Sequence, residues 1–342
     1  MPTWVGVNIK NGDVYISDTN GKAAIILAGN PLRVIKRITL PDMPGFGVID
    51  IELNIVALAG HEEIFIINGN DKTFIKAIPT DALPQTLALD KPTHHLVTGG
   101  FYGDSVTIIS LQDLKYNKLG KFSQSQTPSF STRGKYFAYA ESLLDVNGEL
   151  WVGNRGGFFT IIKGNEVVGR VNVSKEIRIW PIMPEINGST VAPFFYNSKV
   201  YAPVENGIAV INADKKSVIS TINLSKDFKP IWWLHERHML YILDEDTHAW
   251  LVDLSVERLV NDTAWGGVPG VFAKQGSRLL FASLRSNSLR IFDENLKPTG
   301  EIVLSGLSSL TLPKDISVNN SRNEIYVLIF DSNKLRLFAI SV

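Results

Sequence analysis

The chain has 342 residues, of which 44% are hydrophobic and 20% are charged, as in ordinary globular proteins. Its 34 basic residues balance its 34 acidic residues, so the net charge of zero gives no electrostatic basis for binding nucleic acid or an anionic membrane. There is no cysteine, which excludes disulfides, thiol catalysis and cysteine-ligated metal sites.

The N-terminal sequence MPTWVGVNIKNGDVYISD lacks the basic segment and long apolar segment of a secretory signal. No apolar run approaches the ~18 residues that a transmembrane helix needs. We therefore expect no membrane insertion and no export by a signal peptide. The expected location is the cytoplasm, or a virion or other assembly that carries the protein.

Pairs of short β-rich runs recur along the chain, and a polar or glycine-containing turn separates the two runs of each pair. The first pair is DVYIS and AAIIL around the turn 18–21, and the last is EIYVLI and LRLFAI around 331–334. Glycine, Asn and Asp suit the positive-φ positions of tight hairpin turns. The second runs start 40 to 52 residues apart, at positions 23, 64, 106, 158, 208, 249, 289 and 335.

Further short runs precede and follow most of these pairs, which makes four strands in each period of about 40 residues, the pattern of a β-propeller blade. No helical periodicity is visible over the length of an ordinary helix. We predict an all-β chain that forms a single propeller domain over 1–342, with eight blades favoured and seven as the alternative. The predicted blades span roughly 4–40, 44–79, 84–122, 127–173, 177–223, 228–263, 268–304 and 312–342.

The middle of the chain is less regular than the rest. TPSFSTRGKYFAYAE (127–141) already reads as an inner strand, a turn and a second strand, yet the following 148–173 supplies three more runs. Residues 120–135 and 174–190 are therefore extra connectors, or fragments of an irregular blade.

Two segments carry a resemblance to a known repeat. RLLFASLRSNSLRIFDENLKPTGEIVL (278–304) and KVYAPVENGIAVINADKKSVISTINL (199–224) resemble the YVTN-type propeller repeat of surface-layer-like proteins. The literal Tyr-Val-Thr-Asn is missing, and so are the Gly-His and Trp-Asp pairs of WD40 blades. The resemblance implies a propeller, but not one activity, because such repeats occur in surface-layer, binding and enzymatic proteins.

The C-terminal segment Leu335–Val342 alternates apolar and other residues and could be a sheet edge. Propellers often close by letting an N-terminal strand complete the last blade, and we expect that closure here. The alternative is that a partner protein adds a strand at this edge. The candidate interface residues are then Leu335, Leu337, Phe338 and Ile340.

The sequence offers little catalytic chemistry. HERH (235–238) resembles a metal-ligand spacing but falls at a predicted turn, and a hydrolytic zinc site needs a third ligand. DTNGK (18–22) and DEDTH (244–248) lack the calcium-loop spacing. Asp50, Glu52 and Asp315 fall on inner strands, where lactonase-like propellers hold a metal, but the other inner strands are apolar. We therefore predict no catalytic residue, no metal and no cofactor.

Aromatic residues are the other candidates for a binding surface. The four tryptophans near the entry to a blade are Trp4, Trp180, Trp232 and Trp265. They could form a stacking platform for a glycan or another small molecule, but we favour the interpretation that they fill the wedges between blades.

We predict a non-enzymatic scaffold or recognition module that binds protein partners, or its own copies, in a surface layer, an appendage or a virion. A carbohydrate or small-molecule binder is the alternative, and a metal-dependent lactonase- or lyase-like enzyme is the third hypothesis.

Overall fold

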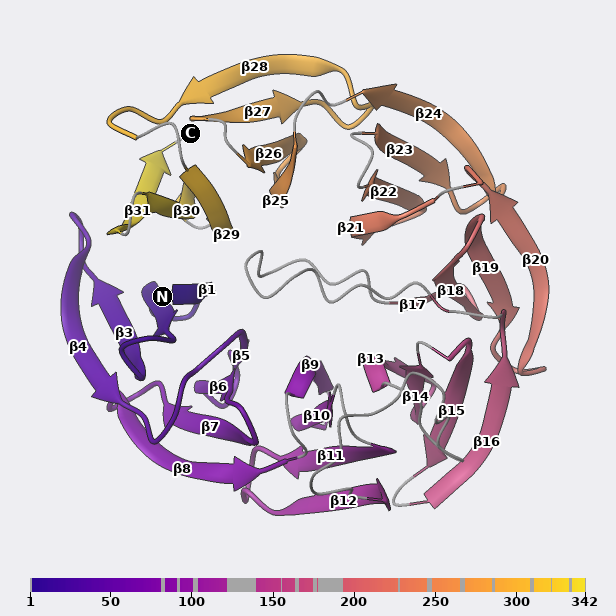
Figure 1. Cartoon of the computed structure of the whole chain (residues 1–342), viewed down its shortest axis with the longest axis horizontal. Coiled ribbons are helices and arrows are strands. Elements are labelled where there is room, and N and C mark those ends of the chain that lie inside the picture. The colour runs from indigo at the N-terminus through magenta and orange to yellow at the C-terminus, as the bar shows by residue number, and fades with distance from the viewer. Residues whose placement is uncertain are drawn as a thin grey trace.

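A computed structural model of the chain describes residues 2–80, 84–90, 93–100, 104–121, 140–154, 156–163, 166–174, 177, 193–226, 228–244, 248–264, 268–284, 287–307, 311–320, 322–331 and 334–341. The structure is all-β, and eight antiparallel sheets form the eight blades of a single propeller (Figure 1). The predicted fold and the favoured blade number are confirmed. The irregular segments around 122–139 and 178–192 lie outside the described residues.

The strands of the first four blades follow one another along the chain, four to a blade. They are β1 (Pro2–Asn8), β2 (Asp13–Asp18), β3 (Ala23–Ala28) and β4 (Arg33–Thr39); β5 (Gly47–Asp50), β6 (Ile55–Ala59), β7 (Glu63–Asn68) and β8 (Thr73–Pro79); β9 (Pro84–Asp90), β10 (His95–Gly100), β11 (Asp104–Ser110) and β12 (Tyr116–Lys121); and β13 (Ala140–Val146), β14 (Glu149–Asn154), β15 (Phe158–Lys163) and β16 (Glu166–Asn172).

The last four blades continue the same order, except that blade 8 has three strands among the described residues. They are β17 (Phe194–Tyr196), β18 (Lys199–Val204), β19 (Gly207–Asn212) and β20 (Ser217–Asn223); β21 (Pro230–Glu236), β22 (Met239–Asp244), β23 (His248–Asp253) and β24 (Arg258–Ala264); β25 (Val268–Gln275), β26 (Arg278–Leu284), β27 (Ser288–Phe292) and β28 (Pro298–Val303); and β29 (Thr311–Asn319), β30 (Glu324–Asp331) and β31 (Lys334–Ser341).

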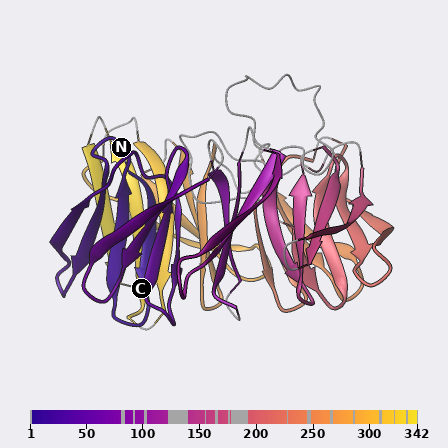
Figure 2. The same cartoon turned by 90° about the horizontal axis from the view of Figure 1, so that it is seen from below.

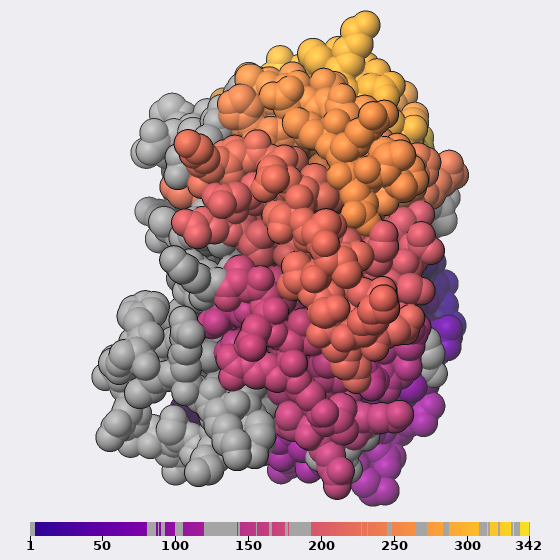
Figure 3. Space-filling view, turned by 90° about the vertical axis from the view of Figure 1, so that its right-hand side faces the viewer, coloured from indigo at the N-terminus to yellow at the C-terminus, as the bar shows by residue number. Residues whose placement is uncertain are grey.

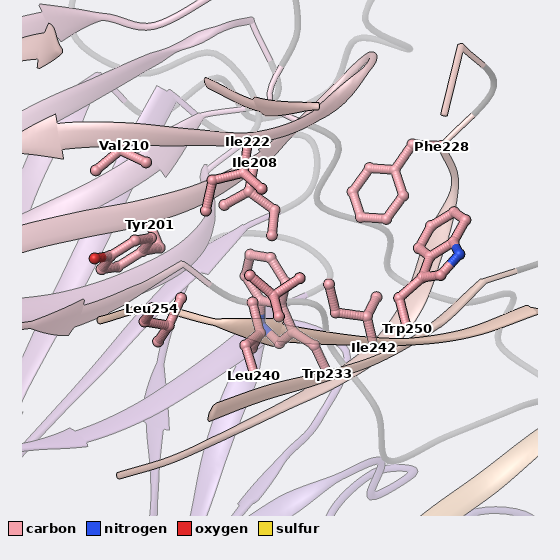
Figure 4. Packing of buried hydrophobic residues seen from close by; sticks show 11 residues of the cluster. Tyr201, Ile208, Val210, Ile222, Phe228, Trp233, Leu240, Ile242, Trp250 and Leu254 are labelled. Carbon is pink, nitrogen blue, oxygen red and sulfur yellow. The ribbon is translucent and has the colours of Figure 1, made fainter. Parts of the chain in front are cut away.

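The second and third strands of a blade are buried on both faces, because each blade packs between two neighbours. In β6 and β7, for example, apolar residues follow one another and almost all of them are buried. The hydrophobic clusters accordingly lie at the junctions between successive blades. Figure 4 shows the junction of blades 5 and 6, where Tyr201, Ile208 and Ile222 pack with Trp233 and Trp250.

The fourth strands form the outer rim of the ring, and most of their side chains are exposed. Figure 3 shows this rim from the side of blades 4 to 7. Six fourth strands carry a β-bulge at the same place, where the pairing with the third strand skips one residue. In five of them the skipped residue is an aliphatic side chain with an exposed fraction of 41% to 53%: Ile35, Ile75, Val168, Ile219 and Val260.

The ring does not close in the way that we expected from the sequence. The N-terminal strand β1 pairs with β2 and is the innermost strand of blade 1, so it does not complete blade 8. Blade 8 packs against blade 1 through side chains of β29, β30 and β31. Figure 2 shows the N-terminus and the C-terminus at opposite ends of the strands.

Candidate interaction edge in blade 8

The outermost described strand of blade 8 is β31, which is a third strand. It pairs with β30 in unbroken register from Asp331↔Lys334 to Glu324↔Ser341. In every other blade a fourth strand lies outside the third, but no strand pairs with the outer side of β31 in the part of the chain that the structure describes (Figure 1). Alternate backbone N–H and C=O groups of such a strand face its open side.

The seven complete blades show what a fourth strand contributes. In each complete blade, one fourth-strand residue pairs with the second residue of the third strand, or with its third residue in the case of β11. In six blades this fourth-strand residue is Ile, Val or Leu. The pairs are Ala24↔Ile38, Ile64↔Ile78, Val106↔Leu119, Phe159↔Val171, Ile208↔Ile222, Ala249↔Thr263 and Leu289↔Ile302. Figure 4 shows the Ile208 and Ile222 side chains together.

Leu337 occupies the equivalent position in β31. Leu337 pairs with Leu328 of the second strand, just as Ala24 pairs with Ser17 in blade 1. Tyr326 and Tyr15, two residues before these second-strand partners, are equivalent in the same alignment. The equivalents of Leu337 in the seven complete blades are all 0% exposed. Leu337 itself is only half-buried, since no fourth strand among the described residues covers it.

Blade 1, which lies next to β31, also has side chains that are less buried than their equivalents in another blade. Phe65 and Ile67 of blade 2 face blade 1, pack with Ile38 of its fourth strand and are both 0% exposed. Their equivalents in blade 1 are Ile25 and Leu27, which pack toward blade 8 near Leu337 and stay half-buried. The surface that a fourth strand would cover beside β31 is therefore apolar on both sides of the junction between blades 8 and 1.

The other described side chains of β31 complete the edge. Phe338 and Ile340 pack toward blade 7, beside Ile291 and Ile302. Arg336 Nε lies 3.1 Å from Oδ2 of the buried Asp331, and the Arg336 side chain is 41% exposed. The strand sequence KLRLFAIS contains two basic residues and no acidic one.

Of the four edge residues that we predicted from the sequence, Leu337, Phe338 and Ile340 lie on β31 with half-buried side chains, and Leu335 lies on the same strand, where it pairs with Phe330. We did not predict that Ile25 and Leu27 would form the facing wall. An alignment of the blades could have found them, because they are equivalent to Phe65 and Ile67.

The tryptophans occupy different surroundings. Trp4 is 9% exposed and belongs to the cluster between blades 1 and 2. Trp232 is half-buried, and its ring centroid lies 3.5 Å from that of Phe272 in blade 7. Both therefore fill junctions between blades. Trp180 and Trp265 lie outside the described residues. The glycan platform stays a prediction.

The histidines of HERH lie at the end of β21 and in the turn that follows. His235 Nε2 lies 2.7 Å from the carbonyl oxygen of Arg237, its ring stacks on Phe194, and burial lowers its pKa. Within the described residues, no cluster of His, Asp or Glu side chains could hold a metal ion.

A carboxylate–histidine contact joins blades 2 and 3. His94 Nδ1 lies 2.7 Å from Oδ2 of the buried Asp50, and His94 Nε2 lies 3.5 Å from Glu52 Oε2. We did not predict this contact. The repeat could have indicated it. Asn8 ends the inner strand of blade 1 and donates a hydrogen bond to Asn54 in a turn of blade 2, and Asp50 and His94 occupy the equivalent positions of blades 2 and 3.

Solved structures share this fold at low sequence identity. The dihydro-heme d1 dehydrogenase NirN in complex with DHE matches with a TM-score of 0.73 and 10% identity over 98% of this chain and 74% of that chain. The computationally designed Ika8 protein matches with a TM-score of 0.70 and 9% identity over 99% and 96%. Sqt1 of Saccharomyces cerevisiae matches with a TM-score of 0.70 and 11% identity over 100% and 96%.

These likenesses establish the fold alone, since a dehydrogenase and a designed protein share it. No protein-family model matches the sequence, and no curated protein matches it. Among the residues that the structure describes, no helix is long and apolar enough to cross a membrane.

Proposed function

We propose that this chain is a non-enzymatic recognition module that binds another protein through the open edge of blade 8. The observation that carries the proposal is the half-buried Leu337 on β31, whose seven equivalents are fully buried under a fourth strand. A strand whose outer side has no partner among the described residues, and whose side chains are apolar on both faces, is a surface to which proteins add a strand.

The proposal includes membership of a larger assembly, such as a surface layer, an appendage or a virion. The resemblance of 199–224 and 278–304 to the YVTN-type repeat supports this setting, and the assignment to that repeat family belongs to the same proposal. The rigid ring of eight blades suits a scaffold, because binding at one blade does not require the others to move.

Native mass spectrometry of the protein purified from its own source tests the proposal. We expect a stoichiometric complex with a second protein, which Ala339→Asp on β31 disrupts because it places a charge at the exposed edge. The control is Ile219→Asp, at another exposed position, on the rim of blade 5, which should leave the complex intact. A 37.9 kDa monomer as the sole species would contradict the proposal.

A further inference from the structure

We infer that β31 accepts one extended segment of a different protein, which runs antiparallel to β31 as the fourth strand of blade 8 and places a branched aliphatic residue opposite Leu337. This inference rests on the proposed function and adds the conformation, direction, register and chemistry of the bound segment. The complete blades supply each of these properties.

The direction and the register come from the pairing in the other blades. All seven fourth strands run antiparallel to the third strand. In blade 5, Ile222 pairs with Ile208, and Asn223 pairs with Gly207. The same register on blade 8 places the aliphatic residue of the bound segment opposite Leu337 and the next residue opposite Arg336.

We expect an aliphatic residue opposite Leu337 because of the apolar side chains that this residue would cover. In the complete blades this residue packs on the third strand of the following blade, as Ile38 packs with Phe65 and Ile67. At blade 8 the following blade is blade 1, which offers the half-buried Ile25 and Leu27. A β-branched or leucine side chain opposite Leu337 would remove this apolar surface from water.

A short extended segment is sufficient, because fourth strands such as β4 and β20 bury little else. In β4 and β20 six of the seven side chains are exposed, and the buried one is Ile38 or Ile222. Main-chain hydrogen bonds to the open strand and one anchoring side chain are the usual elements of strand addition.

Charge favours a different chain over a second copy of this one. Two copies could pair their β31 strands with Leu337 opposite Leu337. That pairing would set Arg336 of one copy opposite Phe338 of the other, so the two Arg336 side chains would lie diagonally across one face of the strand pair, with no acidic residue of β31 between them. Arg336 pairs with Asp331 but its side chain is still 41% exposed, so a second guanidinium group nearby opposes association, whereas an acidic residue opposite Arg336 would favour it.

A synthetic peptide with the sequence of 216–225, KSVISTINLS, tests the inference, because it copies the fourth strand of blade 5. We expect the labelled peptide to bind the full-length protein saturably in fluorescence anisotropy. The Ile222→Asp peptide should bind at least 10-fold more weakly, and the Asn223→Asp peptide severalfold more tightly at low salt. A peptide N-methylated on alternate backbone nitrogens should not bind.

Cross-linking tests the register, and the absence of cysteine from the chain makes it specific. The Leu337→Cys protein should form a disulfide with the Ile222→Cys peptide. It should not do so with the Thr221→Cys peptide, whose cysteine lies opposite Phe338 on the other face. Equal binding by the Ile222→Asp peptide, or equal cross-linking of both peptides, would overturn the inference.

The results can contradict the proposed function and the strand-acceptor inference independently of each other. If native mass spectrometry finds a partner that stays bound in saturating peptide, the proposed function stands and the strand acceptor is wrong. If the peptide binds in the expected register but no protein partner exists, the acceptor stands and the proposed function is wrong. A dimer of the chain that the peptide dissociates would make the occupant a second copy and overturn the assignment to a different protein.

Discussion

Asp315 Oδ2 accepts a hydrogen bond of 2.7 Å from the backbone amide of Val5, across the junction between the last blade and the first. The same carboxyl group accepts a 2.9 Å hydrogen bond from the amide of Ile316 through Oδ1. Asp315 therefore holds β1 against β29 at the point where the ring closes. These two hydrogen bonds assign Asp315 a role in closing the ring.

Burial raises the pKa of Asp315 to about 8, against an ordinary value of 3.8. Between these two values the folded chain binds more protons than the unfolded chain, so the free energy of unfolding falls as the pH rises. The whole loss is on the order of 5 kcal/mol and is complete once the pH passes the pKa of the folded state.

The Asp315→Asn variant tests this pH dependence, because the amide does not titrate, although its single oxygen can accept from only one of the Val5 and Ile316 amides. We expect the variant to be less stable than the wild type at pH 5, and we expect its free energy of unfolding to lack the fall between pH 5 and pH 9 that the wild type shows. Urea denaturation followed across this pH range measures the difference. Parallel curves for the two proteins would show that Asp315 is not the titrating group.

Asp50 and His94 provide a second test, at the junction of blades 2 and 3. Asp50 is 2% exposed and also accepts a hydrogen bond from the amide of Leu53 at 3.0 Å. Asp50→Ala should lower the free energy of unfolding by about 1–3 kcal/mol, because it leaves the half-buried Leu53 amide and His94 ring without this partner. Chemical denaturation checks this value. Glu52→Ala is the control, since its side chain is 79% exposed and its loss should cost at most about 0.5 kcal/mol.

Lys274 pairs with Glu236 of blade 6 and with Glu294, whose Oε1 lies 3.0 Å from Nζ. Its side chain is only 9% exposed. Lys274→Ala should therefore destabilise the fold by about 1–3 kcal/mol, while Lys22→Ala, which removes an exposed pair with Asp42, should cost about 0.5 kcal/mol or less. Thermal unfolding of both variants compares them. Equal effects would mean that burial does not strengthen the Lys274 pairs.

Trp4 distinguishes packing from ligand stacking. Its indole lies beside Gly6, where an added Cβ would meet the ring, and inside the cluster of blades 1 and 2. Trp4→Ala should lower the free energy of unfolding by about 3–5 kcal/mol through the cavity that it leaves. Tyr116→Ala, at a ring that is 44% exposed, is the control. A Trp4→Ala protein with wild-type stability that loses binding on a glycan array would support the glycan platform.

The recurrence of strand pairs every 40 to 52 residues was enough to predict the propeller and its eight blades. The closure could not be predicted in the same way. An inner strand such as β1 has the same local sequence pattern whether it pairs with β2 or with a strand 330 residues away. The sequence pattern therefore does not determine which of the two strands is its partner. The expectation that β1 completes blade 8 was wrong for this reason.

The candidate site was predictable in part. The alternating apolar residues of the last β-rich run predicted a sheet edge, with Leu335, Leu337, Phe338 and Ile340 as the candidate interface residues. The facing wall of Ile25 and Leu27 was not predicted, because these residues look like ordinary core positions in the sequence. Their incomplete burial accompanies the three-stranded form that blade 8 has among the described residues.

The junction between blade 8 and blade 1 also determines how the ring would respond to tension. Within each blade, neighbouring strands share a ladder of backbone hydrogen bonds, whereas β1 and β29 belong to different sheets. A force that pulls blade 8 away from blade 1 would have to separate packed side chains and the Val5–Asp315 hydrogen bond, but no ladder between the described strands. Such a force would open the disc at this junction into an arc of intact blades, at a lower load than is needed to unravel any one of them.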